Sequence, residues 1–367
     1  FGHAAGDRVL ETLSERLTRA LPKESVIGRL AGDEFAVFLE ANSDAHEQHE
    51  QAATLARQLL NSVARPLHVG EHEIVLTVSV GIAACPRDAD NVIDLIRNAD
   101  AAMYHAKRAG RNCHVFYAPE MNAAAVERLL LKSKLRRALE RNEFVLRYQP
   151  KVELGSGKVV GAEALLRWRL PGHGDIAPAQ FIPLAEESRL ILDIGAWVLN
   201  QVCSDYAGWQ KELDDPGLVA INLSLKELSQ ASFIPRCRSV FERHAVSPSR
   251  VELEITETTL MMDAERTLPL LDELRAMGVH LSIDDFGTGY SSLSALQQFP
   301  ISTLKIDKSF VRNAATDPDD ATIVRTIIEM GRSLGLQVLA EGIETEDQRD
   351  FLLLSGCQFG QGRLFGE

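Results

Sequence analysis

The sequence lacks any hydrophobic run long enough to cross a membrane. Its longest apolar stretches, such as residues 123–126 and 351–354, fall far short of the roughly 20 residues that a membrane-spanning helix needs. No basic segment followed by an apolar one marks a signal peptide. The chain opens on Phe1 rather than Met, so we expect a longer protein with an upstream sensory region. Whether that protein is anchored at the inner membrane stays open.

Cysteines are few, and acidic residues outnumber basic ones, 52 to 39. The five cysteines are widely spaced, and no two of them form a C-x-x-C pair. This distribution is typical of a reducing, cytoplasmic compartment. The net charge of −13 argues against a nucleic-acid polymer as partner, because such binding draws on Lys and Arg. An anionic ligand would therefore need a local source of positive charge.

The length of the chain, 367 residues, allows two domains. Helical periodicity at residues 6–21 and 51–62, with strand-like runs at 34–39 and 74–82, predicts a partial α+β domain over residues 1–118. Residues 119–126 are predicted to be a linker, at the start of an amphipathic stretch. Residues 127–367 form the second predicted domain.

Short apolar strands alternate with helical segments in this second part, as in parallel βα units. Eight strands in about 250 residues predict a (β/α)8 barrel of the TIM type. The expected strands cover residues 144–149, 159–168, 218–223, 251–256, 280–285, 303–307, 337–341 and 357–360. The connection between the first two strands turns at residues 153–158, which contain Gly-Ser-Gly, and it is too short for a crossover helix. We therefore expect a hairpin, with the first strand antiparallel to the second.

Polar residues stand at the C-terminal ends of the second to the eighth strand, where barrel enzymes place their chemistry. They are Glu163, Asn222, Glu254, Asp284, Asp285, Lys305, Glu341 and Gln361. Converging carboxylates repel one another unless a cation neutralises them. Oxygen ligands without nearby His or Cys favour Mg²⁺ or Mn²⁺, and two ions would suit water activation beside a phosphate. The alternative is a set of unrelated polar residues at the barrel rim, which their recurrence on successive strands argues against.

The motifs around these residues resemble the EAL family over residues 127–367. In order, they are EAL at 163–165 with LRW at 166–168, FIPLAE at 181–186, NLS at 222–224, EITE at 254–257, DDFGTGYSS at 284–292, KID at 305–307, AEGIE at 340–344 and QG at 361–362. The resemblance implies a barrel with one antiparallel strand, cyclic di-GMP as the substrate and linear pGpG as the product. Arg363 stands where the family usually carries Tyr.

The resemblance also assigns roles residue by residue. One metal ion would be held by Glu163, Asn222, Glu254 and Asp284, and a second by Asp284, Asp285 and Glu341. The catalytic residues would be Glu163, Lys305, Glu341 and Gln361, and Arg167 would contact a substrate phosphate. Glu257 and Glu344 would anchor the loop at residues 284–292. The family further implies a homodimer, two Mg²⁺ or Mn²⁺ ions, and inhibition by Ca²⁺.

Residues 1–118 resemble a GGDEF domain that lacks its beginning. The resemblance lies in GHxxGD at 2–7, RLAGDEF at 29–35, TVSVGI at 77–82 and the stretch 99–112. It implies a palm-like fold that condenses two GTP molecules into cyclic di-GMP across a dimer. The nucleotide and metal residues would be Asp7, Asp33, Glu34, Lys107 and Arg111. Ala31 stands at the first Gly of the motif, which weakens a cyclase interpretation.

Three hypotheses follow from these patterns. The leading one is a metal-dependent cyclic di-GMP phosphodiesterase whose first domain regulates it, with GTP as that domain's candidate ligand. The second is a non-catalytic receptor for cyclic di-GMP. The third is a bifunctional protein whose longer form also makes cyclic di-GMP.

Overall fold

The computed structural model describes residues 3–40, 45–69, 72–262, 264–289 and 296–366. The chain divides into two compact units, Phe1–Leu130 and Leu131–Glu367. Helix α4 (Glu120–Leu135) spans the division, and Leu131 and Leu135 on its last turns are buried in the core of the second unit. In the described part of the chain, no helix is long and apolar enough to cross a membrane.

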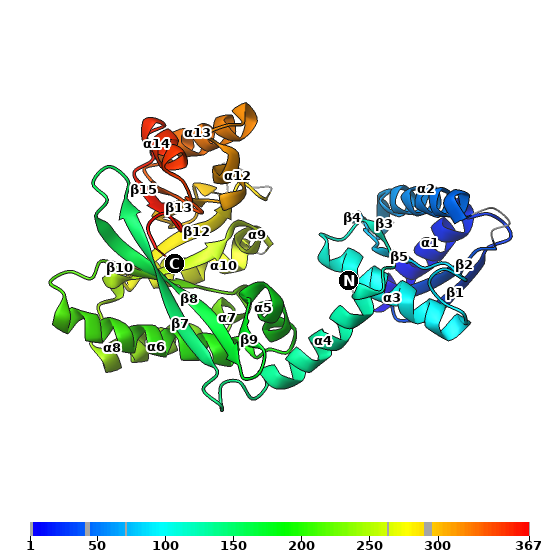
Figure 1. The fold of residues 1–367 in the computed structure, drawn as a ribbon, viewed down its shortest axis with the longest axis horizontal. Coiled ribbons are helices and arrows are strands. Elements are labelled where there is room, and N and C mark those ends of the chain that lie inside the picture. Colours follow the sequence, from blue (N-terminus) through cyan, green and yellow to red (C-terminus); the bar gives the residue numbers. More distant parts are fainter. Residues whose placement is uncertain (1–2, 41–44, 70–71, 263, 290–295, 367) are drawn as a thin grey trace. The chain divides into compact units, whose positions relative to one another are not determined.

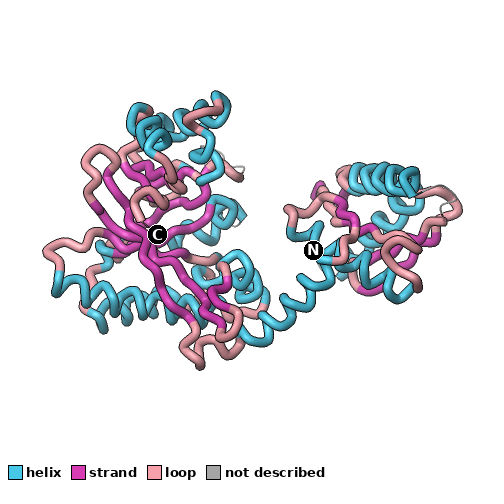
Figure 2. Tube along the Cα trace, viewed as in Figure 1, coloured by secondary structure: helices cyan, strands magenta, loops and turns pink. Residues whose placement is uncertain are grey.

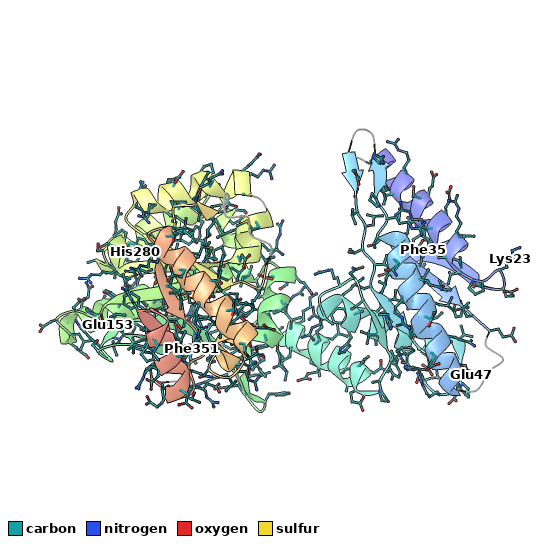
Figure 3. All side chains as sticks on the ribbon, turned by 90° about the horizontal axis from the view of Figure 1, so that it is seen from above. Lys23, Phe35, Glu47, Glu153, His280 and Phe351 are labelled. Atoms are coloured by element: carbon teal, nitrogen blue, oxygen red, sulfur yellow. The ribbon has the colours of Figure 1, made fainter. Side chains whose placement is uncertain are left out.

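The first unit is an α+β structure. Its elements before α4 are α1 (His3–Ala20), β1 (Val26–Ala31), β2 (Glu34–Phe38), α2 (Ala45–Val63), β3 (Leu67–Val69), β4 (His72–Ile74), β5 (Val80–Ile82), α3 (Val92–Arg108) and β6 (His114–Phe116). The strands pair as β1 with β2 and β3 with β4, both antiparallel, and β5 with β6 in parallel. Leucines at helical spacing on α1 pack with Leu59 and Val63 of α2, and Phe35 of β2, labelled in Figure 3, packs against this core.

The predicted strand over residues 74–82 is wrong, because the structure divides this run. Strand β4 ends at Ile74, β5 begins at Val80, and residues 75–79 belong to neither strand. Strand structure requires a hydrogen-bonded partner. The described partners are β3 for β4 and β6 for β5. A continuous apolar run therefore does not suffice for a continuous strand.

The second unit is a closed eight-stranded barrel, as predicted. Its strands are β7 (Phe144–Glu153), β8 (Val159–Leu170), β10 (Leu218–Asn222), β11 (Val251–Thr256), β12 (His280–Phe286), β13 (Thr303–Ile306), β14 (Gln337–Ala340) and β15 (Phe359–Gln361). The order β10-β11-β12-β13-β14-β15-β7-β8 closes where β8 pairs with β10. A short extra strand, β9 (Gly174–Ile176), extends the hairpin beyond β8. Figure 1 shows β7 and β8 as the long green pair.

Helices cover the outside of the strands, as Figure 2 shows. They are α5 (Pro178–Glu187), α6 (Ile191–Glu212), α7 (Leu225–Leu228), α8 (Phe233–His244), α9 (Glu257–Met262), α10 (Ala264–Ala276), α12 (Lys308–Asn313), α13 (Pro318–Ser333) and α14 (Glu346–Leu354), with the 3₁₀ turn Pro248–Arg250 before β11. The local sequence determines where several helices begin. Asp317 is the N-cap of α13, directly before Pro318, and Thr345 forms a capping box with Gln348 at the start of α14.

Strand β7 runs antiparallel to both of its neighbours, β8 and β15. The turn to β8 closes with the Gly157 N–H donating to the Glu153 carbonyl, and Gly157 adopts a φ of +70° that favours glycine. Glu153 pairs with Phe359 at the start of β15, and His280 starts β12, so both mark the end where the parallel strands begin. Figure 3 labels Glu153 and His280. The candidate site lies at the opposite end.

Candidate active site

A buried lysine stands at the centre of the predicted carboxylates. Lys305, at the third position of β13, is 0% exposed. Its Nζ lies 2.7 Å from Glu254 Oε2, 3.3 Å from Glu163 Oε2, 3.0 Å from Asp284 Oδ1 and 2.6 Å from Glu341 Oε1. Burial opposes its charge, but Glu254 and Glu341 above all outweigh burial and hold the pKa of Lys305 well above its usual range. Lys305 is therefore an ammonium shared by four carboxylates, three from strands and one, Glu341, from the residue after β14.

Glu254 is clamped between two lysines. Its Oε2 accepts from Lys305, and its Oε1 accepts from Lys151 Nζ at 2.8 Å. Lys151 also donates to Glu252 Oε2 at 2.9 Å. Burial alone would raise the pKa of Glu254, but Lys151 and then Lys305 outweigh it and lower the pKa to about 2. The two lysines consequently favour the ionised form of Glu254 in the interior of the barrel.

Glu163 is held by two amides as well as by Lys305. Asn222 Nδ2 donates to its Oε1 at 2.7 Å, and Gln361 Nε2 donates to its Oε2 at 2.7 Å. Burial, followed by repulsion from Glu254, raises the pKa of Glu163. With its N–H₂ group turned to Glu163, Asn222 presents its carbonyl oxygen away from that contact, as a metal-binding amide requires.

Asp284, Asp285 and Glu341 form a compact acidic cluster. One carboxylate oxygen from each lies within 4.8 Å of the other two. Burial and then Asp284 raise the pKa of Asp285 to about 6, and burial raises the pKa of Glu341 to about 8 despite Lys305. Asp285 has a φ of +53°, an uncommon conformation for a residue other than glycine. The backbone therefore turns at Asp285 to place two successive carboxylates in one cluster.

The donor set fits a hard divalent cation. Asp284 Oδ1 is buried and has no hydrogen bond in the described structure, although Lys305 Nζ lies 3.0 Å away, and Gln361 Oε1 is buried without a partner there too. Buried polar atoms normally accept a hydrogen bond, so Gln361 Oε1 is available to a ligand, and Asp284 Oδ1 can bind a cation beside Lys305. Carboxylate and amide oxygens are the ligands that Mg²⁺ and Mn²⁺ prefer.

Arg167 and Glu257 are two further predicted residues of the barrel. Arg167 shares a strand face with Glu163, four positions along β8, because alternate residues point to one side. Glu257 is buried and its Oε2 accepts from Gly287 N at 2.9 Å and Gly289 N at 3.2 Å, which ties it to the predicted loop. Residues 290–292 of that loop lie outside the described residues.

Glu344 has a different setting from Glu257. It precedes Thr345, the N-cap of α14, and its backbone N–H donates to Gln348 Oε1 at 2.7 Å. The described contact of Glu344 is therefore with the start of a helix. Its proposed role in anchoring the loop stays a prediction.

The predicted nucleotide residues of the first unit are spread over three elements. Asp7 is exposed on α1, and Asp33 and Glu34 are exposed at the β1–β2 turn, where Gly32 has a φ of +54°. Lys107 lies in the last turn of α3, and Arg111 follows that helix. The described contacts do not join these residues into one cluster.

Sequence reasoning missed three residues that support the site: Gln149, Lys151 and Glu252. Gln149 Oε1 accepts from Gln361 Nε2 at 2.9 Å, and Lys151 contacts Glu254. The predicted first strand stopped at residue 149, so Lys151 fell outside it, whereas β7 continues to Glu153. Glu252 and Glu254 share one face of a buried strand, and that spacing could have identified Glu252 from the sequence.

The family comparisons agree with this architecture. Residues 132–367 match the family described as EAL domain, and residues 1–113 match the family described as diguanylate cyclase, GGDEF domain. The second unit is a TIM-type barrel whose interior carries a cluster of carboxylates. The chain belongs to the EAL family. It carries the GGDEF and EAL regions in tandem.

Relatives and solved structures extend the comparison. The chain is 46% identical over 366 residues to the bifunctional diguanylate cyclase/cyclic di-GMP phosphodiesterase MucR of Pseudomonas aeruginosa, covering 100% of this chain and 53% of MucR. It is 38% identical over 365 residues to the cyclic di-GMP phosphodiesterase NbdA of the same organism, covering 100% of this chain and 46% of NbdA. The chain thus spans about half the length of these curated relatives. The structure of the PaMucR phosphodiesterase in complex with c-di-GMP matches with a TM-score of 0.63 and 48% identity, over 65% of this chain and 96% of that one.

Proposed function

We propose that the barrel hydrolyses cyclic di-GMP to linear pGpG with the help of Mg²⁺ or Mn²⁺. The observation that carries this proposal is the set of four carboxylates around Lys305, which come from within β8, from the C-terminal halves of β11 and β12, and from the residue after β14. The proposal is supported by a relative named as a cyclic di-GMP phosphodiesterase and by a related phosphodiesterase solved with c-di-GMP. The site combines metal-binding oxygens with cationic side chains, as an anionic phosphodiester requires.

Two metal positions are proposed from the donor groups. One would use Glu163, Asn222, Glu254 and Asp284, and the other would use Asp284, Asp285 and Glu341. Bound ions of this kind lower the pKa of water and neutralise charge on phosphate oxygens. Asp284 Oδ1, which accepts no assigned hydrogen bond and is offset only by the ammonium of Lys305, supports Asp284 as the shared ligand.

The side chains of the chain perform the remaining tasks. Arg167 on the Glu163 face of β8 offers a guanidinium that can bind a substrate phosphate through paired hydrogen bonds. Lys305 carries its proton, so it donates hydrogen bonds and offsets charge and does not accept a proton from water. Gln361 has a free, buried Oε1 that can accept a hydrogen bond from the attacking water, while its N–H₂ group is occupied by Gln149 and Glu163.

The reaction balances as a simple hydrolysis. The oxygen of one water bonds to phosphorus, and the phosphorus bond to the ribose 3′ oxygen breaks. One water proton leaves for solvent or a carboxylate, and the 3′ oxygen takes up a proton to become a hydroxyl. The product keeps one intact phosphodiester and gains a terminal phosphate, which defines pGpG.

The test is to incubate the purified chain with cyclic di-GMP and Mg²⁺ or Mn²⁺ and to follow pGpG by chromatography. Glu163→Gln, which keeps the shape of the side chain, and replacement of Mg²⁺ by Ca²⁺ are the controls. We expect pGpG from the wild-type chain and its loss in both controls. Tight binding of intact cyclic di-GMP without turnover would contradict the proposal and favour a non-catalytic receptor.

For the first unit we propose a regulatory role with GTP as its ligand, in a homodimeric protein. The match to the GGDEF family and the exposed Asp33-Glu34 turn support this proposal. MucR is named as bifunctional, so cyclase activity of a longer form is the alternative. Equilibrium dialysis with labelled GTP, beside Asp33→Asn/Glu34→Gln, tests binding. Formation of cyclic di-GMP from GTP would favour the bifunctional alternative.

A further inference from the structure

A second layer of buried charge lies directly below the candidate metal site. Lys151 pairs in register with Gly161 of β8, two residues before Glu163, and Glu252 lies two residues before Glu254 on β11. The side chains of Lys151 and Glu252 are 5% and 4% exposed. This pair belongs to the layer of the barrel interior beneath the predicted ligands, because side chains two apart on a strand share a face.

Lys151 reaches its partners across the barrel interior. Strands β7 and β11 are not neighbours, since β8 and β10 lie between them on one side of the sheet. Lys151 Nζ nevertheless lies 2.9 Å from Glu252 Oε2 and 2.8 Å from Glu254 Oε1. One ammonium thus joins the antiparallel strand to a predicted ligand on the far side of the interior.

The contact restricts the orientation of Glu254. Lys151 donates to Oε1 of Glu254, and Oε2 of the same carboxylate therefore faces Lys305 and the predicted metal ligands. Glu252 uses Oε2 for Lys151, and its buried Oε1 has no hydrogen-bond partner among the described residues. A half-satisfied buried carboxylate is costly to stability, so stability alone does not account for this pair.

We propose that Lys151 is a positioning residue for the metal site: it holds Glu254 by Oε1 and is itself held in place by Glu252. The inference rests on the proposed function, because it assumes that Glu254 binds a metal ion. The described side-chain contacts of Lys151 are with Glu252 and Glu254, so it acts through Glu254. Its contribution is to fix the carboxylate of Glu254 before an ion arrives, and such outer partners typically change metal affinity by about 10- to 100-fold.

The test titrates Mn²⁺ into the metal-free full chain by calorimetry, without substrate. K151M/E252L removes both charges together, and Glu254 keeps its contact with Lys305 through Oε2. We expect it to keep a native circular-dichroism spectrum and to bind Mn²⁺ about 10- to 100-fold more weakly. The single variant K151R keeps a cation beside Glu252 and Glu254, and it should therefore retain most of the wild-type affinity for Mn²⁺.

Tyr148→Phe is the matched control on the same strand. It breaks the 2.6 Å hydrogen bond from Tyr148 to Asp205 of α6, outside the barrel interior, and should leave Mn²⁺ affinity unchanged. If K151M/E252L is insoluble, K151M/E252Q keeps the buried volumes and is judged by the same criterion. A folded variant with wild-type Mn²⁺ affinity would overturn this inference alone. Failure of the wild-type chain to bind Mn²⁺ would overturn the proposed function as well.

Discussion

Lys305 Nζ lies 2.7 Å from Glu254 Oε2, and both side chains are completely buried. Lys305 also contacts Glu163, Asp284 and Glu341. A cation removed from such a network leaves several carboxylates without compensation. The stability of the barrel and its affinity for divalent ions are therefore linked through one side chain.

Lys305→Met is accordingly expected to lower the free energy of unfolding of the metal-free chain by about 3–5 kcal/mol, the typical cost of leaving a buried charge unpaired. Mg²⁺ should restore part of the loss, because it supplies the missing positive charge. Urea unfolding with and without Mg²⁺ measures both effects. Lys158→Met, at an exposed position in the turn before β8, is the control. Equal unfolding free energies for Lys305→Met and the wild type would disprove the linkage.

Glu257 is expected to control the order of the segment that follows Asp285. Glu257→Ala removes the acceptor for the N–H groups of Gly287 and Gly289. Hydrogen bonds to a charged group contribute about 1.5–3 kcal/mol each. Amide exchange at these glycines should therefore accelerate by more than tenfold, and turnover should fall because Asp284 and Asp285 begin the same segment.

Hydrogen exchange of peptides covering residues 284–289 provides the measurement for Glu257. Glu265→Ala, at an exposed position on α10, supplies the comparison. Unchanged protection in Glu257→Ala would show that the segment is ordered by other contacts.

Replacing two glycines of helix α6 by alanine should change the stability of the chain in opposite directions. A Cβ at Gly195 would lie 1.5 Å from Glu227 Oε1, whereas a Cβ at Gly208 would meet nothing within 4 Å. Alanine is favoured over glycine inside a helix by about 1 kcal/mol. Gly208→Ala should therefore stabilise the chain, and Gly195→Ala should destabilise it by about 1–3 kcal/mol through overpacking. Thermal unfolding of the pair decides the matter, and a rise in Tm for both would refute the close contact.

Glu227 should make stability depend on pH. Burial raises its pKa, despite hydrogen bonds from Ser224. A carboxyl with a raised folded-state pKa contributes stability that is present below its unfolded pKa of about 4.3 and is lost as pH rises through the folded pKa. Glu227→Gln keeps the capping box without that loss.

The stability of Glu227→Gln relative to the wild type should consequently increase between pH 4.5 and pH 7. Urea unfolding at the two pH values tests this, beside Glu329→Gln at an exposed position of α13. A difference that does not vary with pH would contradict the expected effect of burial.

Much of the barrel could be predicted because neighbouring residues along the chain specify its strands and turns. Most strands are short apolar runs with a polar residue near the end, and the five-residue connection 154–158 between β7 and β8 is too short for anything but a hairpin. The polar residues Glu163, Glu254 and Asp284 were identified because each interrupts an apolar strand run. Helix starts at Asp317 and Thr345 are likewise local, since a cap bonds to backbone N–H groups in its own first turn.

Tertiary structure decided which of these residues share a partner. No spacing in the sequence shows that Lys305 meets four carboxylates, or that Lys151 crosses the interior to Glu254, because both contacts join strands far apart in the chain. Tertiary structure also decided that the run 74–82 is divided between β4 and β5, because pairing with other strands determines where a strand ends. The sequence by itself determined the elements and the kinds of ligand, and barrel closure determined the charge network, because only closure brings distant strands into a common interior.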